Sequence, residues 1–198
     1  MSSLQAAFYI WAAWAVSWLL AAFWARPAAA RPSFAAEASH RIPTVIGYLL
    51  AFYGAGLAGR GAWQQWADTP LWRLPSWLGW ALTVLAALGF AFTWWARVTL
   101  GALWSGDVSR KADHKVIDTG PYRLVRHPIY TGILVATYAT TAQIGAPSTL
   151  AGIALVTLAF WIKGRLEERF LAQELGEAAY EPYRRRTPML VPFWPARG

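Results

Sequence analysis

The feature that most constrains this chain is its first long uncharged run, residues 4–24, which holds 21 residues without Asp, Glu, Lys or Arg. About 20 such residues span the hydrocarbon core of a bilayer as a helix. A cleaved secretory signal has an apolar stretch of only about 7–15 residues after a basic start. No Lys or Arg precedes this run. We therefore expect a retained membrane-spanning helix, with cleavage after the small residues 28–30 as the alternative.

Four more uncharged runs follow, at residues 42–59, 75–96, 129–144 and 148–162. The first of them contains four small residues whose spacing lets helices approach closely in lipid: Gly47, Gly54, Gly56 and Gly59. Trp side chains near both ends of the next run suit the two headgroup regions of a bilayer. Only residues 145–147 separate the last two runs, which predicts a tight helical hairpin. The expected fold is an all-α polytopic membrane protein with about five transmembrane helices.

The basic residues predict how these helices are oriented. The five segments that follow the five runs hold 3, 2, 6, 0 and 7 Lys and Arg residues in chain order. Cytoplasmic segments carry the excess of basic residues in membrane proteins. We therefore expect the N-terminus outside and the C-terminus in the cytosol, with membrane lipids as partners. The net charge of +8 follows this topology and does not predict a nucleic-acid partner.

Composition excludes several classes of protein. Hydrophobic residues make up 57% of the chain and charged residues 14%, whereas a soluble domain has about 25% charged residues. The chain is therefore too apolar for an ordinary soluble enzyme or a disordered protein. It has no cysteine, which excludes disulfides, thiolate metal sites and cysteine nucleophiles. We expect one integral domain, with three spans in residues 1–96 and a polar loop, the helical hairpin and a cytosolic C-terminal helix in residues 97–198.

Polar residues gather just before the fourth run. Pro128 is typical of the first position of a helix, where its missing N–H costs nothing. Arg126, His127 and Tyr130 would then lie together at the cytosolic end of that helix. Free N–H groups at a helix start attract anions, and Arg adds a planar donor fork for a carboxylate or phosphate. The alternative is that Arg and Tyr serve only as interfacial anchors.

A second charged cluster, residues 163–169, follows the fifth run directly. Carboxylates at a membrane boundary are costly unless they are paired. On a helix, Lys163 and Glu167 lie on one face, whereas Glu167 and Glu168 point about 100° apart. We therefore expect only one of the two carboxylates to face a given site. The alternative is a solvated helix with local ion pairs. The apolar tail at residues 187–194 either covers a site or anchors at the interface, and we favour anchoring for Phe193 and Trp194.

The stretch HKVIDTGPYRLVRHPIYTG, residues 114–132, resembles the signature of the isoprenylcysteine carboxyl methyltransferase family, which takes in related phospholipid methyltransferases. The adjacent Glu167 and Glu168, the tail GEAAYEPY and the later Pro-Phe pair are also similar to that family, so the resemblance covers roughly residues 94–194. It implies an integral membrane enzyme that transfers a methyl group from S-adenosylmethionine and releases S-adenosylhomocysteine. Part of the signature, RHPxYxG, is shared with membrane sterol reductases.

The resemblance also implies where the cofactor lies: in a pocket on the cytosolic side, between the polar loop and the C-terminal helix. The cofactor-binding residues that it implies are His114, Val116, Ile117, Gly120, Tyr122, His127, Pro128, Ile129, Tyr130, Gly132 and Glu167. Glu168 is the alternative to Glu167, and the match near Asp107 is loose. The family has an Arg for the substrate where this chain has Lys163, and that change loses a bidentate fork.

Methyl transfer from a sulfonium is an in-line displacement, so the enzyme mostly supplies proximity and orientation. We expect the catalytic residues to be Lys163, Arg165, Glu168 and Arg126. Lys163 or Arg165 would orient a carboxylate acceptor, and Glu168 or His127 would act as base for an amine or thiol. The acceptor is a lipophilic molecule or lipid whose reacting group stays open. The expected location is a prokaryotic inner membrane. A membrane reductase using NADPH and a non-catalytic scaffold are the alternatives.

Overall fold

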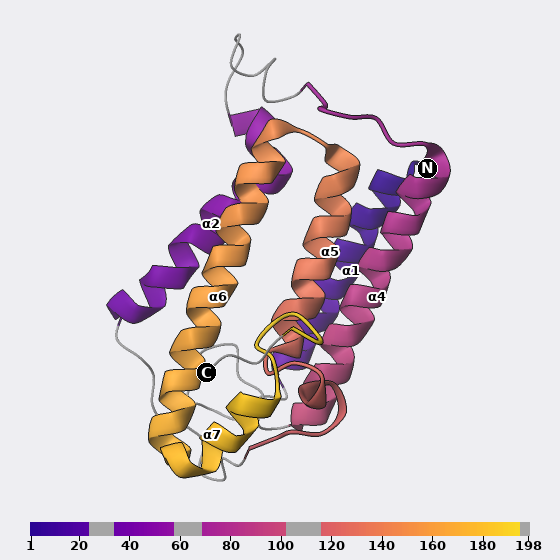
Figure 1. Ribbon diagram of the computed structural model, residues 1–198. Coiled ribbons are helices and arrows are strands. Elements are labelled where there is room, and N and C mark those ends of the chain that lie inside the picture. The colour runs from indigo at the N-terminus through magenta and orange to yellow at the C-terminus, as the bar shows by residue number, and fades with distance from the viewer. Residues whose placement is uncertain (24–33, 58–68, 102–115, 195–198) are drawn as a thin grey trace.

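A computed structural model describes residues 1–23, 34–57, 69–101 and 116–194. Within these residues the chain is helical, without strands (Figure 1). The helices are α1 (Ser3–Ala22), α2 (Phe34–Leu57), α4 (Ser76–Leu100), the short 3-10 helix η2 (Gly120–Arg123), α5 (Pro128–Ile144), α6 (Pro147–Leu175) and α7 (Glu177–Arg186). The all-α polytopic membrane fold expected from the sequence is confirmed.

The described part of each of the five uncharged runs lies almost entirely in a helix. In the described part of the chain, three helices are long and apolar enough to cross a membrane: Ser3–Ala21, Ser76–Leu100 and Pro147–Gln173. The helix α5 has only 17 residues, and α2 carries an ion pair of 3.0 Å between Glu37 and Arg41 near its start. The count of five spans and their orientation therefore stay predictions.

The predicted hairpin between α5 and α6 is confirmed, and local sequence explains it. Gly145 ends α5 with φ of 66°, a left-handed conformation that favours glycine. Pro147 then begins α6, where a missing N–H is tolerated. The helix α6 continues to Leu175, well past the predicted end of the apolar run at residue 162. The charged cluster thus extends the membrane helix without a break.

Glycines set the closest helix contacts. The helix α2 packs along α6, and α4 packs along α5 (Figure 1). A Cβ on Gly47 would meet the Gly152 carbonyl of α6 at 3.0 Å, and Gly89 of α4 faces Gly132 of α5 in the same way. Close packing at Gly47, expected from the sequence, is confirmed. Gly54, Gly56 and Gly59 lie outside the residues whose packing is described.

Two indoles of α1 join the two helix pairs. Trp11 and Trp14 pack against both apolar clusters of the bundle, one around Phe160 and one around Phe90. Each indole also donates a hydrogen bond to a threonine, Trp11 to Thr140 at 3.0 Å and Trp14 to Thr93 at 2.9 Å. Such bonds between helices satisfy polar groups that lipid cannot. This bundle holds the start of α5 and the charged part of α6 at the same end (Figure 1).

Candidate active site

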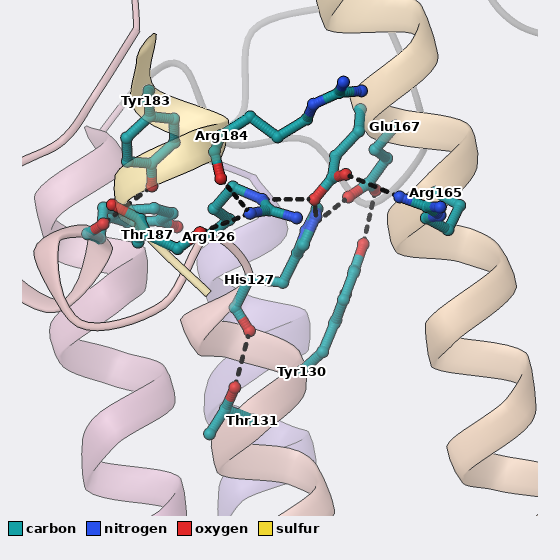
Figure 2. A network of polar contacts seen from close by, with 11 residues as sticks. Arg126, His127, Tyr130, Thr131, Arg165, Glu167, Tyr183, Arg184 and Thr187 are labelled. Atoms are coloured by element: carbon teal, nitrogen blue, oxygen red, sulfur yellow. Dashed lines mark hydrogen bonds and ion pairs between the residues drawn. The ribbon is translucent and has the colours of Figure 1, made fainter. Parts of the chain in front are cut away.

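The two predicted polar clusters meet at one end of the bundle. The loop from residue 116 leads through η2 to the first turn of α5, and this turn faces the charged part of α6. The tail after α7 returns to the same place (Figure 1). Three segments distant in sequence, the loop with the start of α5, the charged part of α6 and the tail after α7, therefore surround one group of charged side chains. Figure 2 shows this group, with His127 and Tyr130 of the α5 end directed at the carboxylates of α6.

His127 lies between two carboxylates. Its Nδ1 is 3.4 Å from Glu167 Oε2, and its Nε2 is 3.1 Å from Glu168 Oε1. The expectation that only one of these glutamates faces the site is wrong. The imidazole places one ring nitrogen against each carboxylate, Nδ1 against Glu167 and Nε2 against Glu168. One histidine thus joins two neighbouring residues of a helix.

Arg126 is enclosed by acceptors, and its side chain is only 2% exposed. Its Nε donates to Glu168 Oε1 at 2.7 Å. Its Nη1 donates to the carbonyl of Arg184 at 2.7 Å and to the carbonyl of Thr187. Buried guanidinium groups need this kind of satisfaction because an unpaired buried charge is costly. The donor fork that the sequence suggested for an outside anion is engaged within the protein.

Tyr130 connects Glu167 to the apolar interior. Its hydroxyl donates a hydrogen bond to Glu167 Oε1. Its ring stacks on His127 with centroids 5.3 Å apart and on Phe160 with centroids 5.0 Å apart. The Lys163 ammonium lies 5.3 Å from the centre of the same ring, within the range of a cation–π contact. The aromatic stack therefore fixes one side of the Glu167 carboxylate.

The protonation of His127 follows from its neighbours. Burial by itself disfavours the imidazolium, but hydrogen bonds and charge from Glu167 and Glu168 outweigh burial and raise the pKa of His127 above its ordinary value. Burial also raises the pKa of the Tyr122 phenol and of the Tyr183 phenol. Both phenols stay protonated at neutral pH, and Tyr183 accordingly donates to the Tyr122 carbonyl at 2.8 Å.

The tail after α7 covers the cluster. We call residues 187–190 the C-terminal clasp. The Arg126 amide donates to the Pro188 carbonyl at 2.8 Å, and the His127 amide donates to the Met189 carbonyl at 3.1 Å. Of the two alternatives for the tail, the clasp therefore fits the one in which the tail covers a site. Phe193 is 93% exposed, and its role as a peripheral anchor stays a prediction.

The remaining predicted residues take other positions. Val116 and Ile117 precede η2 and are partly buried, and Ile129 packs with Tyr130 in the apolar core. Pro128 begins α5 and is buried. His114 and Asp107 lie outside the described residues.

Two predicted glycines face α4, away from the charged group. A Cβ on Gly120 would lie 3.2 Å from Thr99 Oγ1 and 3.5 Å from Trp95 Nε1. Gly132 faces the backbone of Gly89, where the two helices approach closely. Both glycines therefore have a packing role that is visible in the structure.

Arg165 is the most open of the predicted catalytic residues. Its side chain is 40% exposed, and its Nη1 is 4.0 Å from Glu168 Oε2. Its guanidinium also lies 5.7 Å from the centre of the Trp161 ring. Sequence reasoning did not single out Tyr183, Thr187 or Met189. The signal for Tyr183 was its place in the GEAAYEPY pattern, whereas Thr187 and Met189 contribute carbonyl oxygens that no side-chain pattern reveals.

Comparison with known proteins agrees with this architecture. Residues 77–173 match the Isoprenylcysteine carboxyl methyltransferase (ICMT) family. A Methanethiol S-methyltransferase of Pseudomonas sp. is 33% identical over 147 residues, which cover 66% of this chain and 52% of that protein. Protein-S-isoprenylcysteine O-methyltransferase B of Arabidopsis thaliana is 32% identical over 87 residues, or 43% of this chain and 44% of that protein. A Cobalt-zinc-cadmium resistance protein of Cupriavidus metallidurans is 33% identical over 122 residues, which cover 59% of this chain and 52% of that protein.

These matches support a membrane methyltransferase of the isoprenylcysteine carboxyl methyltransferase type, in agreement with the motif around residues 114–132. The apolar helices and the family together identify an integral membrane protein. The chain spans about half the length of the curated relatives that it matches. The matched segment includes η2, α5 and most of α6, and therefore both charged clusters of the site.

Proposed function

We propose that this protein transfers a methyl group from S-adenosylmethionine to a lipophilic acceptor at the cytosolic face of the membrane. The observation that carries the proposal is the pair of carboxylates, Glu167 and Glu168, held on one imidazole where α5 begins. The names of the relatives support methyl transfer, and the family supports a membrane setting. Buried ion pairs seldom add stability over apolar packing, so this concentration of charge favours a functional role.

The donor set of the site fits the proposed cofactor. S-adenosylmethionine carries an ammonium group and a sulfonium, so a binding site needs carboxylate oxygens. The Glu167 side chain is 20% exposed and can be reached by a ligand. Glu168 Oε2 is buried and accepts no hydrogen bond from the described residues. The Arg165 guanidinium lies 4.0 Å from this oxygen, so Glu167 is the carboxylate that remains available to a ligand.

When bound, S-adenosylmethionine supplies an electrophilic methyl group. The chain itself then has to orient the acceptor and handle its proton. Lys163 and Arg165 are the cations that would orient an anionic acceptor, because both follow the apolar run on α6. For a thiol acceptor a base is needed, and the neutral form of the His127 imidazole would serve. The helix ends lie where an apolar acceptor arrives from lipid and a polar cofactor arrives from water.

The acceptor class stays a proposal with two leading members. One relative is named for methylation of methanethiol, a small thiol, and another for methylation of isoprenylcysteine. Lys163 favours an acceptor that needs one compact cation and not a bidentate fork. A phospholipid amine and a quinone-like lipid are further candidates. A prokaryotic inner membrane is the location that we propose for this activity.

Thermal unfolding of the detergent-purified protein tests the proposal. A ligand that binds only the folded state raises the Tm by mass action. We expect S-adenosylhomocysteine to raise the Tm and NADPH to leave it unchanged. A shift with NADPH alone would establish the reductase alternative, and no shift with either ligand would favour the scaffold. After a shift with S-adenosylhomocysteine, methyl transfer from labelled S-adenosylmethionine to thiol and carboxylate acceptors of increasing chain length identifies the acceptor class.

A further inference from the structure

The two glutamates of α6 differ in how readily a ligand can reach their carboxylates. Glu168 is 3% exposed and uses one oxygen, Oε1, for both Arg126 Nε at 2.7 Å and His127 Nε2 at 3.1 Å. The Glu167 side chain is 20% exposed and contacts the other ring nitrogen of His127. A ligand therefore reaches Glu167 more readily, whereas Glu168 is bound mainly to the protein.

Arg126 continues this connection to the C-terminal clasp. The guanidinium that donates to Glu168 also donates to the carbonyls of Arg184 and Thr187, at the end of α7. The backbone of the same residue donates to Pro188. One residue thus joins α6, α7 and the clasp. Thr131 adds a bond of 2.6 Å from its hydroxyl to the Leu190 carbonyl.

The clasp lies directly against the imidazole. The Met189 side chain packs over Gly164, and a Cβ on Gly164 would lie 3.2 Å from His127 Nε2. The absence of a side chain at residue 164 therefore lets both Met189 and His127 approach α6. If the clasp moved, His127 would lose its backbone bond to Met189 and one wall of its surroundings.

We propose that Arg126 and Glu168 are positioning residues, which hold the C-terminal clasp and His127 so that Glu167 presents its carboxylate to the cofactor. Neither residue of the pair touches cofactor or acceptor. This inference rests on the proposed function, and it assigns the cofactor contact to Glu167 in preference to Glu168. It also removes Arg126 from the residues that would bind an acceptor.

The test needs at least one variant in which no buried charge is left without its partner. Removing one partner of a buried ion pair leaves the other uncompensated, which is strongly destabilising. We therefore compare Arg126→Gln, Glu168→Gln and the double variant, which has neither charge. The matched control is Arg185→Gln, which breaks an exposed Arg–Glu pair of 2.8 Å on α7. Arg185 is 75% exposed and contacts no residue of the site that the structure describes.

The first readout is hydrogen exchange of the amides of Arg126 and His127, which donate to the clasp. We expect faster exchange in Arg126→Gln and in the double variant and unchanged exchange in Arg185→Gln. The second readout is the affinity for S-adenosylhomocysteine by calorimetry. A lost hydrogen bond to a charged group corresponds to roughly 10- to 100-fold in affinity, so we expect the double variant to bind S-adenosylhomocysteine more weakly by a factor in this range. Arg185→Gln should bind like the parent.

The third readout separates positioning from a purely structural role. His127 faces Glu167 and Glu168 of α6 and Tyr130 of α5, and it adjoins Arg126, with Lys163 close to the Tyr130 ring. Nitrogen-15 spectra of the labelled imidazole report its titration. In folded Glu168→Gln, one flanking carboxylate is gone, so the titration midpoint of His127 should move to lower pH. A pair that only stabilised the fold would give the same shift without a loss of affinity for S-adenosylhomocysteine, so the titration and the affinity together separate the two roles.

Two results would overturn the inference. One is parent-like exchange and parent-like affinity in the folded double variant. The other is a folded Glu168→Gln protein that loses S-adenosylhomocysteine binding while the exchange of the clasp amides is unchanged, because Glu168 would then contact the ligand itself. Failure of the proposed function is distinct, since the parent protein would then show no binding. In that case exchange still decides whether the pair holds the clasp.

Discussion

The two ends of α5 are fixed by different chemistry. At the hairpin end the bonds are neutral: Trp72 donates to the Ala142 carbonyl at 2.9 Å, and Thr83 donates to the Ser3 carbonyl at 2.9 Å. At the other end, charged side chains from the start of α5 and from α6 share one buried cluster, with Arg126 and Glu168 at 2.7 Å. A membrane bundle can be held by neutral bonds and packing alone. The contrast therefore separates the end that serves folding from the end that we assign to methyl transfer.

Burying charged side chains at the end of a membrane helix bundle costs free energy, so the charged cluster needs an explanation that the neutral hairpin end does not. An apolar replacement for a buried ion pair is often neutral or stabilising. The hairpin end shows that this chain can close a helix pair without charges, by Gly145, Pro147 and neutral donors. The charged end is therefore the place where substitutions should affect ligand binding more than folding. The predictions that follow test this division, beginning with the largest effect.

Glu167→Ala should abolish detectable binding of S-adenosylhomocysteine. This variant removes the more exposed carboxylate of the site and the acceptor for the Tyr130 hydroxyl. A hydrogen bond to a charged group contributes up to about 3 kcal/mol, which is roughly 100-fold in affinity. Calorimetry with detergent-purified protein measures the loss. Arg184→Ala is the control, because its side chain pairs with Glu181 on the same helix. An equal loss in Arg184→Ala would move the site toward α7.

The sequence predicted the membrane fold because hydrophobic run length has a direct physical meaning in a bilayer. The described parts of all five runs are almost entirely helical, and the hairpin at Gly145 follows from its local residues. The sequence did not predict the end of α6, because Lys163 to Glu168 suit a helix as well as they suit a boundary. Hydropathy locates the apolar part of a helix and carries no signal for where its polar extension stops.

The sequence predicted which residues meet at the site better than it predicted which contacts they make. His127, Tyr130, Glu167 and Glu168 do meet, as their motif implied. The sequence left open which group Arg126 would bind, because its partners include backbone carbonyls of residues 184 and 187. Carbonyl acceptors are common to every residue and leave no trace in a pattern of side chains. His127 contacts both glutamates because of the position of its ring, and this position cannot be predicted from the spacing of residues 167 and 168 on a helix.

The charged end should also respond to pH, with a definite sign. The carboxylates raise the pKa of His127 in the folded protein above its unfolded value. A raised pKa contributes stability that is fully present below the unfolded pKa and is lost as pH rises through the folded pKa. We therefore expect the Tm to fall as pH rises from about 6 through the titration of His127.

His127→Gln serves as the comparison, because glutamine keeps a hydrogen-bonding side chain and does not titrate. Its Tm should change less over the same pH interval than that of the parent. Thermal unfolding at a series of pH values, with ionic strength held constant, measures the difference. Identical pH profiles for the two proteins would show that His127 does not hold an additional proton in the folded state. Among the residues described at the hairpin contacts, Trp72, Thr83 and Gln143 do not titrate, so changes at these positions should leave the profile intact.

The smallest effect is expected at the hairpin end. Thr83→Val removes the hydroxyl that donates to the Ser3 carbonyl and contacts Gln143. A hydrogen bond between membrane helices contributes on average about 0.6 kcal/mol, so the Tm should fall slightly. Binding of S-adenosylhomocysteine should stay at the parent value, because Thr83 lies near the hairpin, at the opposite end of α5 from His127. A marked loss of binding without a loss of stability would show that the two ends are coupled. It would also mean that the division between a folding end and a functional end fails.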